Sequence, residues 1–226
     1  MSGIKQPLIK YDFSKLKPIA AGAAGTAKIK DLIGDDNDLD ICKGDDCEKL
    51  TSTEATNLQL PITLDSSMHY KKDSINNINL TEGFTIYMEL DLDLASSNIG
   101  FFNIYKTVAA VQLTLYYTTD TITFIYNSIP ETTTTFTVNT PATYKTLVLT
   151  GKKTETPKLY LDGIEQETDS TGNIVSLGAI TKLEIGNSTI NSNDTNFTGK
   201  IYSFELYDYD ISTDSKFDQW LLINPA

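Results

Sequence analysis

The feature that most constrains the fold of this sequence is a long alternation of apolar and polar residues from position 84 to position 94. Alternation with a period of two is typical of a β-strand, because successive side chains point to opposite faces of a sheet. The sequence therefore predicts one long strand with a continuous apolar face. The residues of that face are Phe84, Ile86, Met88, Leu90, Leu92 and Leu94.

Shorter segments of the same character precede and follow this strand, at the spacing expected for a β-sandwich. The chain is rich in Thr, Tyr, Ile and Val, which favour half-buried strand positions. At 226 residues, with 40% hydrophobic residues, it is long enough to fill the core of a single sandwich domain. The further strands are predicted at residues 8–13, 58–64, 68–71, 101–104, 110–117, 121–126, 134–138 and 145–150.

Three short strings in the last third of the chain carry a family resemblance. The first, at 158–163, ends in Asp162-Gly163, which supplies the positive-φ positions of a two-residue hairpin turn. The second, at 183–188, ends a strand in turn-forming residues, and the third, at 197–207, is a strand with one irregular step that indicates a bulge. In this order and spacing the strings resemble the laminin-G-like, concanavalin A-type jelly roll.

The resemblance implies an all-β fold, a two-sheet antiparallel β-sandwich with a short C-terminal helix. It covers residues 7–223 as one domain, after an N-terminal tail at 1–6. The sequence itself favours the helix, because Ser212 is a suitable N-cap and Phe217, Trp220 and Leu221 fall on one helical face. Residues 20–27, rich in Ala and Gly, are expected to form a loop.

Composition excludes some classes of partner. The formal net charge is −12 and all 18 basic residues are Lys, so the phosphate backbone of a nucleic acid would be repelled. No apolar run reaches the roughly 18 residues of a membrane span, so membrane insertion is not expected. The segment that follows Met1 is polar and lacks the apolar region of a signal peptide, which indicates synthesis in the cytoplasm if Met1 is the native start.

Two cysteines, Cys42 and Cys47, are separated by four residues. The single histidine, His69, is distant in sequence, so a four-ligand zinc site is not expected. A disulfide across the small loop is geometrically allowed. Free thiols are the favoured alternative, because the inferred compartment is reducing.

The candidate catalytic residues are Glu89, Asp91 and Asp93, which alternate with the leucines of the long strand. Their side chains are therefore expected on one face, about 6–7 Å apart along the strand. Retaining glycosidases use two carboxyl groups roughly 5–5.5 Å apart, and some jelly-roll glucanases carry a similar acidic strand. The alternative is a solvated strand face kept soluble by charge, and we favour it.

The candidate metal site lies in the acidic stretch from position 35 to position 48. Calcium takes about six to eight oxygen ligands from flexible loops, so the chemistry is suitable. The EF-hand pattern is not met, because Ile41 stands where glycine is needed. The sequence does not decide between a calcium site and a solvated acidic loop. The candidate ligands are Asp35, Asp36, Asp38 and Asp40.

The candidate ligand-binding residues are four tyrosines and one asparagine. Aromatic faces beside Asp and Asn side chains commonly hold a sugar ring. Tyrosine is equally common on exposed sheet faces and at oligomer interfaces, so a homo-oligomer stays open. The candidates are Tyr117, Tyr202, Tyr207, Tyr209 and Asn187, the last in an expected polar loop at 187–196.

We therefore expect a non-catalytic binding or structural module. A jelly roll made in the cytoplasm fits a bacteriophage virion protein, a capsid decoration or fibre component, with virion structural proteins and a glycan or host-surface ligand as partners. The first alternative is a secreted or cell-surface bacterial carbohydrate-binding or adhesion protein. The second is a glycoside hydrolase that uses Glu89, Asp91 and Asp93. No cofactor is required apart from the open question of calcium.

Overall fold

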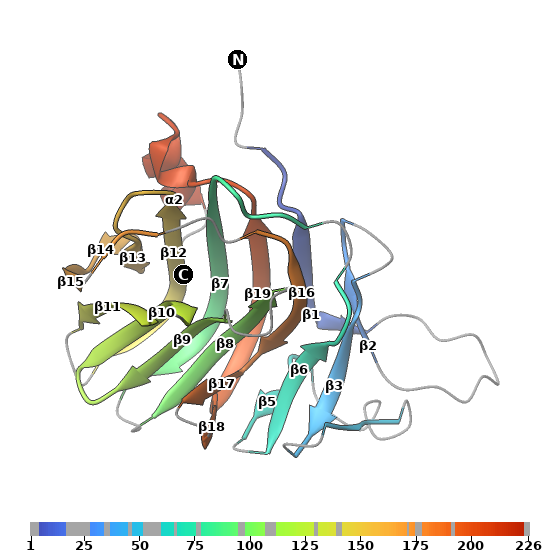
Figure 1. Ribbon diagram of the computed structural model, residues 1–226. Helices are drawn as coiled ribbons and strands as arrows, with labels where there is room; N and C mark the ends of the chain where they lie inside the picture. The colour runs from blue at the N-terminus through green and yellow to red at the C-terminus, as the bar shows by residue number, and fades with distance from the viewer. Residues whose placement is uncertain are drawn as a thin grey trace.

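The computed structural model of the chain describes residues 5–16, 28–33, 37–44, 47–51, 60–65, 67–75, 78–94, 98–106, 112–128, 131–138, 142–170, 172–174, 178–190 and 193–223. These residues form two layers of antiparallel strands, which Figure 1 shows one behind the other. The predicted two-sheet, all-β sandwich is confirmed.

The rear sheet is built around the long strand that the sequence predicts. The strands lie in the order β14, β13, β12, β7, β19, β1, and all neighbours are antiparallel. The short strand β5 (Thr63–Leu64) pairs with the beginning of β19. The bounds of the sheet's strands are β1 (Ile9–Leu16), β7 (Gly83–Asp93), β12 (Thr143–Lys152), β13 (Lys158–Leu161), β14 (Ile164–Glu165) and β19 (Gly199–Tyr207).

The front sheet has the order β15, β11, β10, β9, β8, β16, β6, β3, β4, again with antiparallel neighbours. Strand β2 (Lys28–Asp31) pairs with both β1 and β3 and so joins the two sheets along one edge. The strands are β3 (Leu39–Lys43), β4 (Glu48–Lys49), β6 (Met68–Lys72), β8 (Ile99–Lys106), β9 (Gln112–Thr118), β10 (Thr121–Ser128), β11 (Glu131–Thr137), β15 (Glu167–Ser170) and β16 (Ile180–Ile185).

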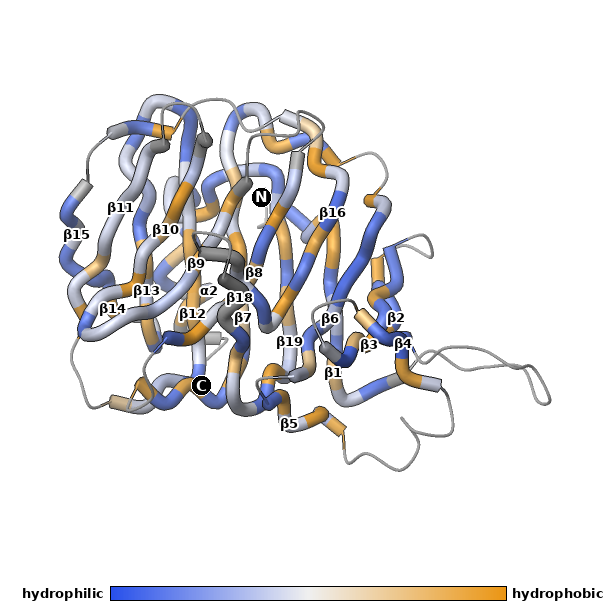
Figure 2. The backbone as a smooth tube through the Cα atoms, turned by 60° about the horizontal axis from the view of Figure 1, so that its bottom comes forward, coloured by the Kyte–Doolittle hydropathy of each residue, from blue (hydrophilic) through white to orange (hydrophobic). Residues whose placement is uncertain are grey.

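The hydrophobic core lies between the sheets. The predicted apolar face of β7 is buried there, as are apolar residues from nearly every other long strand. Figure 2 shows the resulting alternation of hydrophobic and hydrophilic residues along the strands. Each fully buried Leu, Ile or Phe contributes about 1.5–3 kcal/mol relative to an exposed position, so this alternation stabilises the packing of the two sheets.

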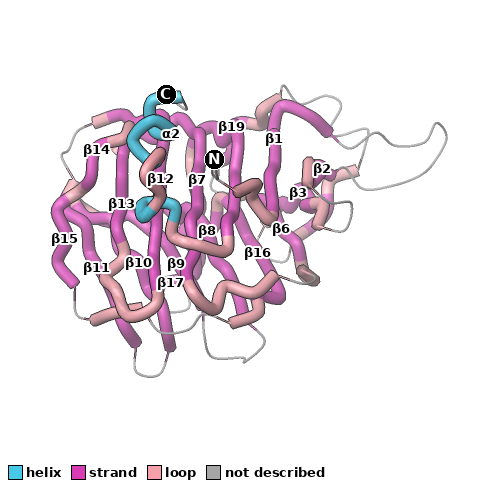
Figure 3. Tube along the Cα trace, turned by 90° about the horizontal axis from the view of Figure 1, so that it is seen from above, coloured by secondary structure: helices cyan, strands magenta, loops and turns pink. Residues whose placement is uncertain are grey.

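A second, smaller cluster lies on the outer face of the rear sheet, where α2 (Phe217–Ile223) packs. Figure 3 shows the helix outside the strand layer, beside β12. The apolar face of α2 covers Tyr87, Val148 and Tyr160, with the Trp220 ring 5.4 Å from that of Tyr87. The predicted C-terminal helix is therefore present. In the described part of the chain no helix is long and apolar enough to cross a membrane.

The predicted cap of this region was wrong. Ser212 lies inside a 3₁₀ turn, η1 (Ile211–Thr213), and the N-cap is Asp210. The Asp210 carboxylate accepts hydrogen bonds from both the backbone N–H and the hydroxyl of Ser212, at 2.9 and 2.6 Å. A carboxylate can accept both bonds at once, so Asp210 caps the turn and Ser212 becomes its donor.

Two local predictions are confirmed and one is corrected. Asp162 and Gly163 have φ values of 47° and 78° and connect β13 to β14, and β19 has a register shift after Ile201. The expected polar loop at 187–196 is instead a β-hairpin of β17 (Asn187–Ile190) and β18 (Asn193–Asn196). The expected loop at 20–27 lies outside the described residues, as do positions 58–59 of the expected strand at 58–64. Of the remaining positions of that strand, only Thr63–Leu64 forms one, β5.

Candidate functional site

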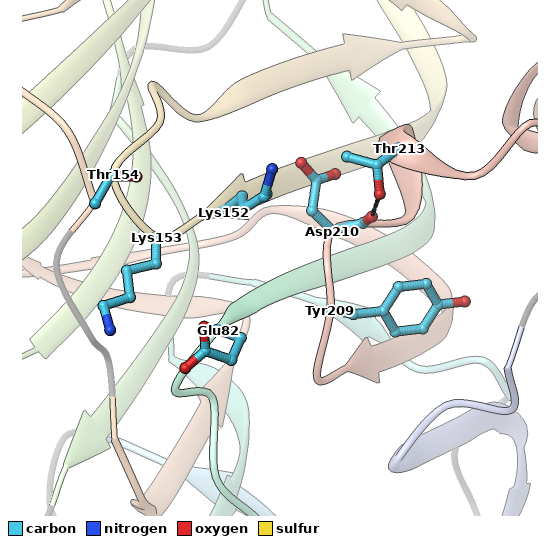
Figure 4. Close-up of a pocket in the computed structure, with 7 residues that line it drawn as sticks. All are labelled: Glu82, Lys152, Lys153, Thr154, Tyr209, Asp210 and Thr213. Carbon is cyan, nitrogen blue, oxygen red and sulfur yellow. Dashed lines mark hydrogen bonds between the residues drawn. The ribbon is translucent and has the colours of Figure 1, made fainter.

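A cavity of about 360 Å³ opens at the end of the rear sheet, where β7 begins and β12 ends. Three segments that are distant in sequence meet there: the turn before β7, the turn after β12, and the connection from β19 to η1. Ligand sites are typically clefts of about 300–1,000 Å³. The lining residues, drawn in Figure 4, are Glu82, Lys152, Lys153, Thr154, Tyr209, Asp210 and Thr213.

One buried hydroxyl fixes the backbone of the third segment. The Thr85 side chain on β7 donates a hydrogen bond to the carbonyl oxygen of Tyr209 at 2.9 Å and accepts one from the N–H of Ile211 at 3.0 Å. The Thr213 hydroxyl donates to the carbonyl oxygen of Asp210 at 2.8 Å, the dashed line in Figure 4. Because these bonds join the connection to the sheet and to itself, Tyr209 and Asp210 hold a defined position at the cavity.

Gly83 lets this connection approach the sheet. A Cβ atom at position 83 would lie 2.8 Å from the carbonyl oxygen of Gly151 and 3.1 Å from the backbone nitrogen of Asp210. Both are backbone atoms, which cannot move aside as a flexible side chain can. The close approach of β7, β12 and the Asp210 segment therefore requires glycine here.

The cavity carries charges of both signs. The Lys152 ammonium forms an ion pair with Glu155 at 2.5 Å, and this hydrogen bond, followed by the charges of Glu155 and Asp210, raises the pKa of Lys152. Figure 4 shows the Lys152 ammonium beside the Asp210 carboxylate. In the described part of the chain no carboxylate forms an ion pair with Lys153.

Tyr209 forms a rim of the cavity, and Figure 4 shows its ring projecting away from the other lining residues. Its hydroxyl accepts a hydrogen bond from the N–H of Lys5 at 3.0 Å, and the Lys5 ammonium lies 5.2 Å from the ring centroid. Burial raises the pKa of Tyr209, so its hydroxyl is protonated at neutral pH and can donate as well as accept.

Of the five predicted ligand-binding residues, the structure brings only Tyr209 to the cavity. Tyr117 and Tyr207 are 3% exposed: the Tyr117 hydroxyl donates to the carbonyl oxygen of Leu94, and the Tyr207 hydroxyl donates to Glu205. Asn187 is also buried, in the β17–β18 hairpin. These three offer no open surface to a sugar ring. Tyr117 faces the core between the sheets, whereas Tyr207 lies on the outer face of the rear sheet and packs against Trp220 of α2. Tyr202 lies half-buried on the outer face of the rear sheet.

The three acids of β7 occupy the outer face of the rear sheet, as the alternation predicts. Asp91 accepts a hydrogen bond from the Lys145 ammonium and another from the Tyr202 hydroxyl, the latter at 2.7 Å. The Lys145 bond, with that of Tyr202, lowers the pKa of Asp91. A carboxyl held in its ionised form is poorly suited to act as a general acid. Glu89 and Asp93 lie on the same face, half-buried and exposed respectively.

The predicted calcium ligands are only partly described. Asp35 and Asp36 lie outside the described residues. Asp38 accepts a hydrogen bond from the N–H of Asp31 at 3.0 Å, and Asp40 forms ion pairs with Lys28 at 3.4 Å and Lys49 at 2.7 Å. Two ammonium groups already compensate the Asp40 charge, and among the described residues neither Asp38 nor Asp40 belongs to a group of three or more potential metal ligands.

The preference for free thiols was wrong, because Cys42 and Cys47 form a disulfide. The strand β3 and the turn before β4 place their Cα atoms 4.5 Å apart, within the usual range for a disulfide. The distance in sequence between His69 and the cysteines was also misleading. His69 lies on β6 directly opposite Cys42.

Sequence reasoning missed six of the seven residues that line the cavity. They lie in turns that become neighbours only when the sheet forms, and each turn alone is an ordinary polar connection. The available signal was Gly83, followed directly by the predicted strand, and Gly151 at the end of another: glycine in a strand pattern often marks a close backbone approach.

Comparison with known proteins adds evidence on the fold. No protein-family model matches the sequence, and no curated protein matches it in sequence. Domain 4 of AbnA, an extracellular GH43 arabinanase from Geobacillus stearothermophilus, solved in complex with arabinotriose, is similar in structure. The TM-score is 0.61 at 12% identity, over 96% of this chain and 98% of that domain.

Botulinum neurotoxin binding domains are similar to about the same degree. The serotype D ligand binding domain in complex with N-acetylneuraminic acid matches with a TM-score of 0.54 at 14% identity. The binding domain of botulinum neurotoxin DC in complex with rat synaptotagmin II matches with a TM-score of 0.63 at 10% identity. Each match covers 96% of this chain, which spans only about half of the toxin domains, 50% and 51%. At such identities the likeness shows the fold alone.

Proposed function

We propose that this chain is a non-catalytic carbohydrate-binding module whose sugar site is the cavity at Tyr209. The observation that carries the proposal is the composition of that cavity. An aromatic ring forms its rim, and two carboxylates, two ammonium groups and two hydroxyls line the rest, from Glu82, Asp210, Lys152, Lys153, Thr154 and Thr213.

This set matches the chemistry of a sugar. Each sugar hydroxyl both donates and accepts hydrogen bonds, so a site needs acceptors such as Asp210 and Glu82 beside donors such as Lys153. The C–H face of the sugar ring needs an apolar surface, and we assign that role to the Tyr209 ring at the edge of the cavity, on the side that the Lys5 ammonium does not cover. The Thr85 and Thr213 hydrogen bonds fix the backbone of Tyr209 and Asp210 beforehand, so binding does not have to order that segment.

The structural neighbours support this proposal over the alternatives. The arabinanase domain was solved with arabinotriose, and its match to this chain extends over nearly all of both. One neurotoxin domain was solved with N-acetylneuraminic acid. The arabinanase is described as extracellular, and disulfides such as Cys42–Cys47 are typical of oxidising compartments. We therefore favour an extracellular or cell-surface binding module over a virion component, for which no observation in the structure argues.

A glycosidase is the weaker alternative. Its strongest candidate acid, Asp91, is bonded to Lys145 and Tyr202 and has a lowered pKa, whereas a glycosidase's general acid needs a raised one. The acidic strand also lies on the outer face of the rear sheet, apart from the residues that line the cavity.

The test is a glycan array probed with the full chain, once with calcium and once with a chelator. We expect saturable binding to a defined group of glycans that the chelator leaves unchanged, because the proposed contacts are hydrogen bonds and a ring contact, which need no metal. If the chelator abolished binding, the glycan site would have to lie elsewhere than in the cavity. A folded protein that binds no glycan under either condition would contradict the proposal.

A further inference from the structure

Three potential metal ligands converge in the front sheet, apart from the cavity. The two sulfur atoms of Cys42 and Cys47 and a ring nitrogen of His69 all lie within 4.8 Å of one another. Cys42 is fully buried and His69 is 3% exposed. Among the described residues this is the only such group of three or more His, Cys, Asp and Glu side chains.

The backbone, rather than the disulfide alone, brings these residues together. Cys42 on β3 is paired directly with His69 on β6, in a register that runs from Asp40 to Lys43. The turn that carries Cys47 is closed by hydrogen bonds from the N–H of Cys47 to the carbonyl of Gly44, at 3.1 Å, and from the N–H of Gly44 to the carbonyl of Ser67, at 2.6 Å. None of these bonds involves a sulfur atom, so breaking the sulfur–sulfur bond removes neither their donors nor their acceptors.

We propose that reduction of the Cys42–Cys47 disulfide converts this group into a three-ligand site for zinc. A dithiol or phosphine reductant supplies two electrons and breaks the sulfur–sulfur bond, and each sulfur takes up a proton. Zinc then binds both sulfurs as thiolates and releases the two protons, with neutral His69 as the third ligand and water as the fourth. The site is closed in the oxidised protein, because sulfurs bonded to each other are not thiolates.

The geometry suits zinc. With Zn–S of about 2.3 Å and Zn–N of about 2.0 Å, a tetrahedral ion holds its ligand atoms roughly 3.5–3.8 Å apart. The ligand atoms here already lie inside 4.8 Å of one another, so the sulfurs need only separate after reduction. Calcium and magnesium prefer oxygen ligands and would not compete for two thiolates and an imidazole.

The test is a titration with Co²⁺, which takes the same tetrahedral ligands and is coloured. The full chain is reduced with a phosphine without oxygen, its fold is checked by circular dichroism, and Co²⁺ is added. We expect one equivalent to give a thiolate-to-cobalt charge-transfer band that zinc abolishes, and the oxidised protein to give none. The Cys42→Ser/Cys47→Ser variant has no thiolate and should lack the band.

The His69→Gln variant distinguishes a three-ligand site from metal binding by the two cysteines alone. Loss of a direct ligand should weaken cobalt binding at least roughly 100-fold, since even loss of an outer-sphere partner costs about 10–100-fold. A folded, reduced chain without the charge-transfer band would overturn the proposal, as would equal affinity in His69→Gln. A reduced chain that unfolds would overturn it as well, because the proposal requires the β3–β6 framework to persist.

Discussion

The buried hydroxyl of Thr85 donates a hydrogen bond to the carbonyl oxygen of Tyr209, 2.9 Å away and 124 residues later in the chain. Thr85 lies on the central strand of the rear sheet, and Tyr209 forms the rim of the cavity. The same hydroxyl accepts a bond from the N–H of Ile211. Through this contact the rigid part of the sandwich positions the residues that we assign to sugar binding.

Replacement of Thr85 by valine should therefore loosen the cavity. Valine has nearly the same shape but leaves the Tyr209 carbonyl and the Ile211 N–H without their partner. We expect the free energy of unfolding to fall by about 1–3 kcal/mol, measured by urea denaturation, with a lower affinity for any glycan found on the array. Thr85→Ser keeps the hydroxyl and is the control. A valine variant with the stability of the parent would show that the bond is unimportant.

Removal of the Tyr209 ring should weaken glycan binding without unfolding the protein. We expect Tyr209→Ala to lower the affinity about 10- to 100-fold in a calorimetric titration, which corresponds to roughly 1.4–2.8 kcal/mol. The matched control is Tyr202→Ala, a half-buried tyrosine of the same sheet outside the cavity. Equal losses in the two variants would assign the effect to the sheet surface in general rather than to the cavity.

The buried carboxylate of Glu184 makes the stability of the front sheet depend on pH. Glu184 is 5% exposed and accepts hydrogen bonds from Lys182, Tyr105 and Asn103, at 2.6, 2.9 and 3.2 Å. Burial acts to raise its pKa, but the Lys182 ion pair, with the bonds from Tyr105 and Asn103, outweighs burial and lowers it below the usual 4.5. The ionised form is therefore the one that the fold stabilises.

The sign of the effect follows from linkage. A lowered pKa contributes stability that is complete above the usual pKa of 4.5 and is lost as the pH falls through the lower pKa of the folded state. Glu184→Gln should cost about 1–3 kcal/mol of unfolding free energy near pH 7, and the difference from the parent should shrink near pH 3. Urea denaturation at both pH values tests this, and an unchanged difference would contradict it.

The disulfide should stabilise the fold modestly. The bridge closes a loop between residues only five positions apart, for which the chain-entropy relation gives about 2 kcal/mol. We expect Cys42→Ser/Cys47→Ser to lower the free energy of unfolding by about that amount, with the overall strand content unchanged in far-ultraviolet circular dichroism. A loss much larger than this would show that the bridge organises the front sheet beyond closing its loop.

The fold was predictable because it depends on short-range patterns. The alternation from Phe84 to Leu94 predicts which face of β7 is buried, and Asp162-Gly163 predicts a turn. Both predictions depend only on the local sequence. Neither inference needs a partner strand to be identified. The hairpin at 187–196 was missed because its asparagines favour turns, whereas pairing with a facing strand overrides that preference.

The site was much less predictable, because it consists of contacts between distant segments. Tyr209 could be chosen as an aromatic residue among acids, but its neighbours Glu82 and Lys153 come from turns on other strands. Tyr117 and Tyr207 have the same residue type and are buried. His69 and Cys42 likewise become neighbours only through the register of β3 and β6. Residue type alone does not predict which distant residues come into contact.

The most direct test of the central claim is a crystal structure of the full chain with the glycan that binds best on the array. We predict electron density for the sugar in the cavity, with its ring against Tyr209 and its hydroxyls within hydrogen-bond distance of Asp210 and Lys153. Density for the sugar at another place, such as the outer face of the front sheet, with an empty cavity at Tyr209, would contradict the assignment.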